Sequence, residues 1–176
     1  MSARHAPGAA PVRLLVFAPA HADVQLLRGA LTLAAGWRAE TQGAVELWQA
    51  HGADPAALDL VVHEYDVVLR TQAEGDPGTR LWLALAANLA RGAVPLLIDA
   101  ASPGLALRHL RAAQAALAGC DAVCLTAADG SLALLGLARA VPEVLAGIPW
   151  GQAPVLPALR ARAQRWKFSL KELAQS

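Results

Sequence analysis

The sequence predicts a single α/β domain with a mainly parallel sheet and helices on both faces of that sheet. Short runs of β-branched and other apolar residues, typical of buried strands, recur along the chain. Segments of twelve or more residues with apolar side chains at helical spacing separate most of these runs. Parallel neighbours in a sheet need such a crossover, so this alternation favours parallel over antiparallel pairing.

The expected strands are apolar runs bounded by Pro, Gly or polar residues. The first, VRLLVF at 12–17, stands between Pro11 and Pro19. An Ala-Asp-Gly-Ser segment at 128–131 is typical of a turn and joins two later strands. The remaining strands are expected at 44–50, 65–72, 94–99, 120–127, 131–138 and 167–173.

The first expected helix covers residues 22–35. Its apolar side chains recur every third or fourth position, which places them on one face, and Gly36 is expected to end it. Those apolar residues are Val24, Leu27, Leu31 and Ala34.

Three further helices are expected where a capping residue precedes a proline. Asp54, Asp76 and Ser102 each stand before Pro, the order typical of an N-cap and the first helical position. Gly92 and Gly119 are expected to end the second and third of these helices.

A last helix is indicated near the carboxyl end of the chain. Leu156, Leu159, Ala163 and Trp166 form an apolar stripe at helical spacing. The basic residues between them flank this stripe on two sides instead of forming one patch, and we expect them to face solvent.

Length and composition limit the possible partners. The chain has 176 residues, of which 56% are apolar and 16% charged, so it should fold around a sizeable core. We expect a flexible tail at 1–11 and one domain at 12–176. A formal net charge of +1 gives no reason to expect nucleic acid or an anionic membrane as a partner.

No membrane-spanning segment or signal peptide is expected. The longest uncharged run, 144–159, contains three prolines and is shorter than the ~18–20 residues that cross a bilayer. The first eleven residues lack the apolar stretch of a signal peptide. A cytoplasmic protein is the default expectation.

Four stretches, taken in order, resemble a known family. They are TQAEGDPGTRL (71–81), PLLIDAASPGLALRHLRAAQAALAGCDAV (95–123), ADGSLALLGL (128–137) and LAGIPWGQAPVL (145–156). Together they resemble the bacterial radical-SAM/selenodomain-associated transferases, a branch of the nucleotide-diphospho-sugar transferases with the GT-A fold. The resemblance implies a GT-A-like, Rossmann-type architecture and a nucleotide-sugar site at the strand ends, with Mg²⁺ or Mn²⁺ as cofactor if the site is active.

The resemblance also carries a set of candidate site residues. The substrate-binding candidates are Asp76, Arg80, Pro103, Gly104, Asp129 and Gly130, and the metal-binding candidates are Asp99 and Asp129. Acidic oxygens would hold a divalent metal that neutralises a diphosphate leaving group. Basic side chains near the first strand would bind the phosphates directly.

This chain departs from the family pattern at the charged positions. The family's Gly-Thr-Asp-Cys-Pro-Gly-Leu segment matches residues 99–105, which places Ala101 at the metal-binding Asp. Gln25 and Leu27 stand where the family carries a Lys and an Arg. The Glu-Asp pair of a later motif is reduced to Asp129. Turn and packing residues are kept, which is typical of a retained fold with a lost site.

Each candidate has a simpler structural interpretation. Asp99 is either a displaced metal ligand or the cap of the following turn, and we favour the cap. Asp76 is either a ligand residue or a helix N-cap, and Asp129 is either a site acid or a turn residue. Arg80 either binds an anion or lies exposed on its helix. His109, beside two arginines on its helix, is expected to face water.

Two functions remain open at this point. The first is a transferase-like protein with weak or no catalysis, which persists as a binding or assembly partner and forms a homo-oligomer. The second is an active metal-dependent transferase of a sugar or nucleotidyl group that uses a rearranged site. The missing charges favour the first, so the sequence leaves open whether the chain is an enzyme.

Overall fold

The structure, a computed structural model, describes residues 10–146, 148, 150, 152 and 154–175. The tail expected at 1–11 therefore lies mostly outside the described residues. Pro149, within the LAGIPWGQAPVL stretch that carries part of the family resemblance, also lies outside them.

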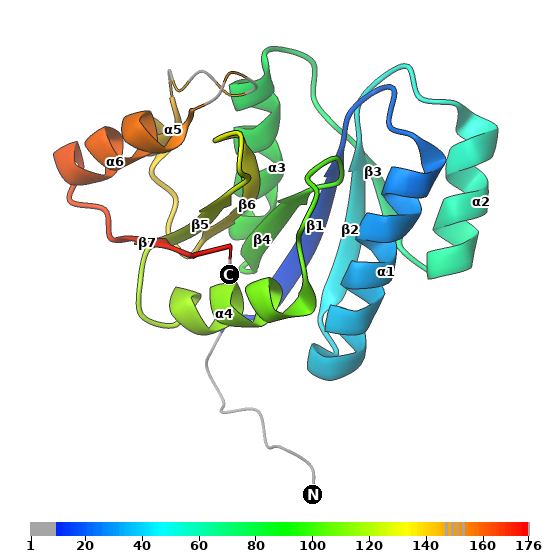
Figure 1. Cartoon of the computed structure of the whole chain (residues 1–176), viewed down its shortest axis with the longest axis horizontal. Coiled ribbons are helices and arrows are strands. Elements are labelled where there is room, and N and C mark those ends of the chain that lie inside the picture. Colours follow the sequence, from blue (N-terminus) through cyan, green and yellow to red (C-terminus); the bar gives the residue numbers. More distant parts are fainter. Residues whose placement is uncertain (1–9, 147, 149, 151, 153, 176) are drawn as a thin grey trace, which may run out of the picture.

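One sheet of seven strands runs through the described part of the chain (Figure 1). Parallel pairing joins β3, β2, β1 and β4, while β6 is antiparallel to both of its neighbours, β4 and β5. β7 then adds to β5 in parallel. The prediction of a mainly parallel sheet is confirmed. In sheet order the strands are β3 (Val68–Thr71), β2 (Ala44–Gln49), β1 (Val12–Ala18), β4 (Val94–Asp99), β6 (Leu132–Leu137), β5 (Ala122–Thr126) and β7 (Leu170–Glu172).

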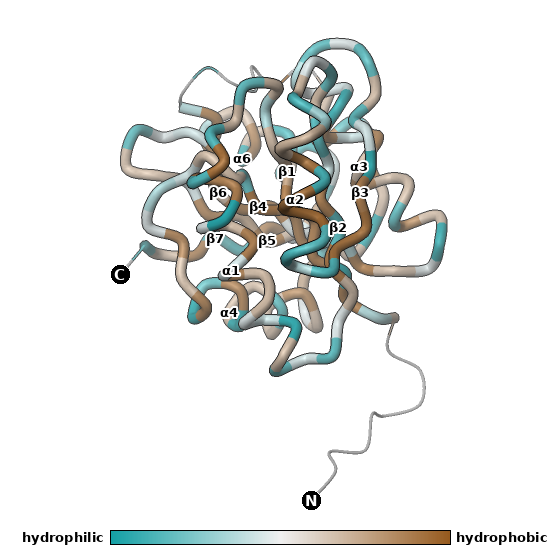
Figure 2. Tube along the Cα trace, turned by 90° about the vertical axis from the view of Figure 1, so that its right-hand side faces the viewer, coloured by the Kyte–Doolittle hydropathy of each residue, from teal (hydrophilic) through white to brown (hydrophobic). Residues whose placement is uncertain are grey.

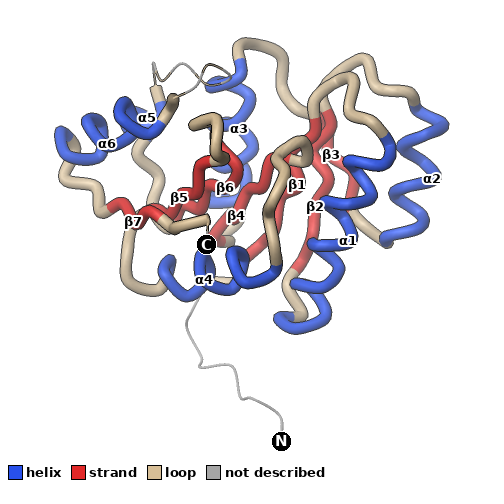
Figure 3. The backbone as a smooth tube through the Cα atoms, in the orientation of Figure 1, coloured by secondary structure: helices blue, strands red, loops and turns tan. Residues whose placement is uncertain are grey.

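Helices cover both faces of the sheet, so the core has two halves (Figure 3). Alternate residues of each central strand enter opposite halves: Leu14 and Val16 of β1 pack under one helix layer, and Leu15 packs under the other. In the tube coloured by hydropathy, the central strands are brown and the teal segments lie around them (Figure 2). The first layer contains α1 (Val24–Thr41), α2 (Pro55–Tyr65) and α4 (Leu107–Leu117), and the second contains α3 (Pro77–Ala90), α5 (Pro142–Leu145) and α6 (Leu156–Arg165).

The expected end of the first helix and the expected start of the third strand are wrong. α1 continues past Gly36 to Thr41, because Trp37 is fully buried and its indole N–H donates to Gln114 Oε1 of α4 at 2.9 Å. This packing outweighs the roughly 1 kcal/mol that a glycine costs inside a helix. Tyr65, expected to open a strand, is instead the last residue of α2, and Asp66 follows in the left-handed region at φ 50°.

α4 begins four residues later than expected, at Leu107 instead of Pro103. Ser102 is not its N-cap, because Gly104 has a left-handed backbone conformation (φ 82°) that a helix cannot include. The helix starts at Leu107. His109 Nδ1 accepts the backbone N–H of Ala106 at 3.1 Å. The imidazole is buried, so the expectation that His109 faces water is wrong.

The stripe on α6 is shorter than the sequence predicts. Leu159 and Ala163 are buried, but Trp166, at the end of the helix, is 43% exposed. α6 stops one residue earlier, so Trp166 is carried away from the apolar face.

A buried carboxylate stabilises the sheet at the edge where its parallel strands begin. Glu46 of β2 is 1% exposed and lies near three arginine side chains, with N–O distances of 2.9 Å to Arg13, 3.2 Å to Arg91 and 3.5 Å to Arg70. The indole N–H of Trp48 also donates to Glu46, at 2.9 Å. Among the described residues, no helix is both long enough and apolar enough to cross a membrane.

Candidate functional site

The chain changes direction within the sheet between β1 and β4. From β1 the chain passes through α1 to β2 on one side, whereas α3 carries it from β3 across to β4 on the other side. Open parallel sheets bind ligands beyond the carboxyl ends of their strands at such a switch point. The residues that follow β1 and β4 therefore form the candidate site.

A small hollow lies at this switch point. It has a volume of about 170 Å³, and its walls come from the first turns of α1 and from the residues between Ile98 and Leu105. Gln25 and Asp99 both line it. Pockets for small molecules usually measure about 300–1,000 Å³, so this hollow accommodates only part of a nucleotide.

Asp99 is the last residue of β4, and its carboxylate is hydrogen-bonded within its own turn. Oδ1 accepts the backbone N–H of Ala101 at 3.0 Å, and Oδ2 accepts the hydroxyl of Ser102 at 3.2 Å. Burial raises the pKa of Asp99, which the two hydrogen bonds offset only in part. This geometry matches the turn-capping interpretation.

The positions where the family pattern carries charges are occupied differently here. Ala101 is exposed just beyond the end of β4. Leu27, at the position of the family's Arg, is 3% exposed and packs into the core beneath α1. Position 27 thus serves packing in this chain, and position 101 carries no acidic group.

Asp129 and Gly130 lie in the turn that joins β5 to β6. Asp129 Oδ1 accepts the backbone N–H of Ser131 at 2.9 Å and its hydroxyl at 2.6 Å, and these bonds lower the pKa of Asp129. Gly130 has φ 83°, which favours glycine. The turn lies at the same sheet edge as Asp99, since β5 and β4 run in the same direction.

Pro103 and Gly104 lie between these two loops. They line a second hollow of about 430 Å³, whose other walls include Ala128, Leu125 and Arg108. The structure thus brings the loop after β4 together with the loop after β5, as the sequence-based site requires.

Arg80 is held by a buried glutamine. Gln72, 2% exposed, donates its amide Nε2 to the carbonyl oxygens of Ala18 at 2.7 Å and Trp48 at 2.9 Å. Its remaining oxygen, Oε1, accepts from Arg80 Nη1 at 3.1 Å. The guanidinium is thereby fixed beside the carboxyl ends of β1 and β2. Arg80 Nε is buried and has no hydrogen-bond partner among the described residues.

Asp76 is the N-cap of α3. Its Oδ1 accepts the backbone N–H of Thr79 at 3.1 Å, and its Oδ2 accepts the hydroxyl of Thr79 at 2.6 Å. The side chain lines a third cavity, which lies between α3 and α5 and is separate from the hollow beside Asp99. Asp76 is therefore not gathered with Asp99.

No metal centre is assembled by the described residues: nowhere among them do three or more His, Cys, Asp or Glu side chains gather in a way that could hold a metal ion. Asp99 and Asp129, the expected ligands, each accept hydrogen bonds from neighbouring residues of their own turns.

Sequence reasoning missed two buried glutamines at the strand ends. Gln72 positions Arg80. Gln49, 4% exposed, donates to the carbonyl oxygen of Pro19 at 2.8 Å, and its own Oε1 has no hydrogen-bond partner in the part of the chain that the structure describes. The available signal was a polar residue directly after, or at the end of, an apolar strand. Such residues are commonly solvent-facing, so this signal alone did not distinguish them.

Comparison with known proteins identifies one family and many solved structures of the same fold. The model of a family described as "Uncharacterized protein conserved in bacteria (DUF2064)" matches residues 32–152. No curated protein matches this chain.

The solved structures are similar in fold. A protein from Desulfovibrio desulfuricans G20 named "putative nucleotide-diphospho-sugar transferase" is 18% identical with a TM-score of 0.78, over 93% of this chain and 80% of that one. The 4-diphosphocytidyl-2C-methyl-D-erythritol synthase of Anaerococcus prevotii DSM 20548 is 11% identical with a TM-score of 0.65, over 94% and 87%.

A third structure, CMP:2-keto-3-deoxy-manno-octonic acid synthetase in complex with CTP, is 7% identical with a TM-score of 0.61, over 93% of this chain and 89% of that one. At such identities the likeness shows the fold alone. It confirms the predicted architecture of nucleotide-diphospho-sugar transferases and cytidylyltransferases.

Proposed function

This chain belongs to the bacterial family DUF2064, and on that premise we propose that it is a nucleotide-diphospho-sugar transferase-like protein whose metal- and phosphate-binding residues are largely lost. It binds a nucleotide or a nucleotide sugar at the carboxyl ends of β1 and β4 and transfers little or nothing. The likeness over residues 72–156 supports placing it with the radical-SAM/selenodomain-associated branch.

The conformation of the Asp99 turn carries this proposal. Both carboxylate oxygens accept hydrogen bonds from neighbouring residues, and burial raises the pKa, so the group is poorly suited to bind a cation. The exposed position two residues later, where an acidic ligand would reach solvent, is Ala101. The residues present do not fit a resident Mg²⁺ or Mn²⁺, and no catalytic step is assigned to one.

Arg80 supports retained anion binding. Gln72 accepts a hydrogen bond from Nη1 of Arg80, and a guanidinium has five N–H donors, so further donors remain for a phosphate. The hollow between Pro103, Gly104 and Ala128 provides room of about 430 Å³ at the same sheet edge.

Isothermal titration with CTP, UDP-glucose and GDP-mannose, each with and without Mn²⁺, tests the proposal. We expect at least one of them to bind with an affinity that Mn²⁺ changes by less than about threefold, and no transfer or hydrolysis product after long incubation. Failure of all three to bind overturns the binding part. Mn²⁺-dependent turnover would instead establish the active transferase with a rearranged site.

A charge variant locates the bound anion. Arg80→Met should weaken binding at least tenfold, because it removes the cation and leaves the fold of α3 intact. Arg111→Met is the matched control, since Arg111 pairs with Glu40 at the end of α1 that points away from the candidate site. Equal losses in both variants would remove Arg80 from the site.

We also propose that the chain forms a homo-oligomer through the free edge of β3. All four residues of this strand are exposed, and Val68 and Leu69 are 51% and 39% exposed. An edge strand with apolar side chains and unpaired backbone groups favours pairing with another strand. Light scattering should show a dimer that Leu69→Lys converts to a monomer; a monomeric native chain contradicts this. Cytoplasmic location remains a prediction.

A further inference from the structure

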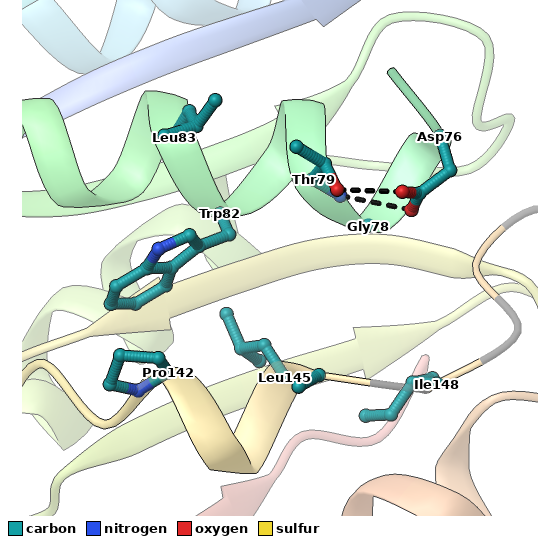
Figure 4. A pocket seen from close by; sticks show the side chains of 9 residues that line it. Asp76, Gly78, Thr79, Trp82, Leu83, Pro142, Leu145 and Ile148 are labelled. Atoms are coloured by element: carbon teal, nitrogen blue, oxygen red, sulfur yellow. Dashed lines mark hydrogen bonds between the residues drawn. The ribbon is translucent and has the colours of Figure 1, made fainter.

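A cavity outside the switch point lies between α3 and α5 (Figure 4). It has a volume of about 430 Å³, within the range of small-molecule pockets. Most of its lining is apolar, and the polar groups gather at one end. The side chains that matter below are Asp76, Thr79, Trp82, Pro142, Leu145 and Ile148.

Two facing walls give this cavity the shape of a slot. The indole of Trp82 projects from α3, while Pro142 and Leu145 of α5 and Ile148 lie opposite it in Figure 4. Trp82 is only partly buried, and its N–H makes no hydrogen bond to the described residues. A flat ring can therefore stack on the indole, with aliphatic groups covering its other face.

The slot is preformed because Trp150 joins its two walls. The Trp150 ring lies against Gly78 of α3, and its indole N–H donates to the carbonyl oxygen of Leu145 at 3.1 Å. Trp150 is itself 7% exposed. A binding surface that needs no rearrangement avoids part of the entropic cost of association.

The polar end accepts hydrogen bonds. The bonds from Thr79 lower the pKa of Asp76, so its carboxylate is ionised at neutral pH. They occupy two of its roughly four lone-pair positions, and the Thr79 hydroxyl, having donated its proton, is an acceptor as well. The slot thus presents acceptors to a ligand and disfavours anions.

From these features we propose that the slot binds an aryl or similarly apolar glycoside: a molecule whose apolar ring stacks on Trp82 and whose sugar hydroxyls donate to Asp76 and Thr79. Trp82 lies six positions after Asp76, a rise of about 9 Å along the helix axis, which is too long for one small ring and suits two linked rings. This site is separate from the proposed nucleotide site, because Arg80 is directed to Gln72 at the strand ends.

Nucleotide-free protein is used for the test, so its outcome does not depend on the proposed function. p-Nitrophenyl β-D-glucopyranoside is titrated while the tryptophan indole resonances are followed by ¹H–¹⁵N correlation spectroscopy. We expect saturable binding at or below about 1 mM with a shift of the Trp82 resonance. Trp82→Ala should weaken binding at least tenfold, whereas Trp166→Ala, at an exposed tryptophan outside the slot, should leave it unchanged.

Four further probes separate the alternatives. Nitrobenzene and glucose alone should bind at least fivefold more weakly, because each engages one end of the slot. p-Nitrophenyl phosphate should be excluded by the charge of Asp76. Benzylamine that binds more tightly than the glucoside, and loses that affinity in Asp76→Asn, would overturn the proposal in favour of an organic cation. Absence of saturable glucoside binding, or equal binding by the Trp82 variant with native circular dichroism, would also overturn it.

Discussion

A β-carbon on Gly78 would lie 2.5 Å from Cδ1 of Trp150, well inside van der Waals contact. The first turn of α3 therefore lies directly on the indole ring. Gly78 and Trp150 are far apart in the sequence but are in contact in the fold. Trp150 in turn holds Leu145 through its N–H. Glycine is required at position 78 by the space available and not by its backbone conformation.

Gly78→Ala should lower the free energy of unfolding by about 1–3 kcal/mol, because Trp150 has to move and is closely packed. Urea denaturation measures this. Gly29→Ala is the control: Gly29 is exposed on α1 with nothing within 4 Å of its would-be β-carbon, so alanine should stabilise by up to about 1 kcal/mol. Equal effects at the two positions would contradict the proposed contact.

Ala101→Asp should create a site for Mn²⁺, because it places a carboxylate at an exposed position beyond the end of β4. Calorimetric titration with MnCl₂ should show affinity at least tenfold higher than for the native chain. Ala112→Asp on the exposed face of α4 is the control for adding one negative charge. If both variants bound Mn²⁺ equally well, the proposal that Ala101 replaces a metal-binding residue would be wrong.

Asp99 should make the protein less stable as the pH rises. Its pKa is raised in the folded state by burial, so the unfolded chain loses this proton first, and the contribution is unfavourable above about pH 4, the ordinary value. Asp99→Asn, which keeps an acceptor for Ala101, should reduce the decline between about pH 4 and neutrality. Denaturation at several pH values checks this; parallel curves for the two proteins would refute it.

Glu46→Gln should lower the free energy of unfolding by about 1–3 kcal/mol at pH 7, since three arginines would lose their shared carboxylate. Burial raises the pKa of Glu46, but the hydrogen bonds from Arg13 and Trp48 lower it by more than burial raises it. The net pKa is below the ordinary value. This stability is therefore present at neutral pH and lost as the pH falls through the lowered pKa. Glu64→Gln, in an exposed pair with Arg28, should change the unfolding energy by less than about 0.5 kcal/mol.

The thiol of Cys124 should resist alkylation until the protein unfolds, because burial raises its pKa to about 12. Cys120 is only half-buried and should be modified first. Mass spectrometry after iodoacetamide treatment in native buffer, with a sample in urea as control, distinguishes the two. Prompt modification of Cys124 in the native sample would argue against its burial.

Much of the fold could be predicted because local patterns agreed with the tertiary structure. The first strand, the proline-led starts of α2 and α3, and the turn at 128–131 were all found where the residue types indicated. Errors arose where tertiary packing overrode local signals. Burial of Trp37 carried α1 through Gly36, and His109 supplied a cap that Ser102 was expected to provide.

The candidate site could be predicted only in outline. The loops were placed correctly because the carboxyl ends of parallel strands share one edge. Asp99 and Asp129 each accept hydrogen bonds within their own turns, which is the structural interpretation that the sequence offered for both residues beside the ligand interpretation. Gln72 was missed because its role depends on the carbonyl groups of two other strands.

Gln72 follows β3, the outermost strand of the sheet, which among the described strands has a hydrogen-bonded neighbour on one side only. The same amide that reaches the carbonyls of β1 and β2 also holds the guanidinium of Arg80. Fraying of β3 would therefore increase the mobility of the Arg80 guanidinium. A second molecule paired with β3 would reduce that mobility. Self-association and anion affinity would then be thermodynamically linked, each strengthening the other by the same factor.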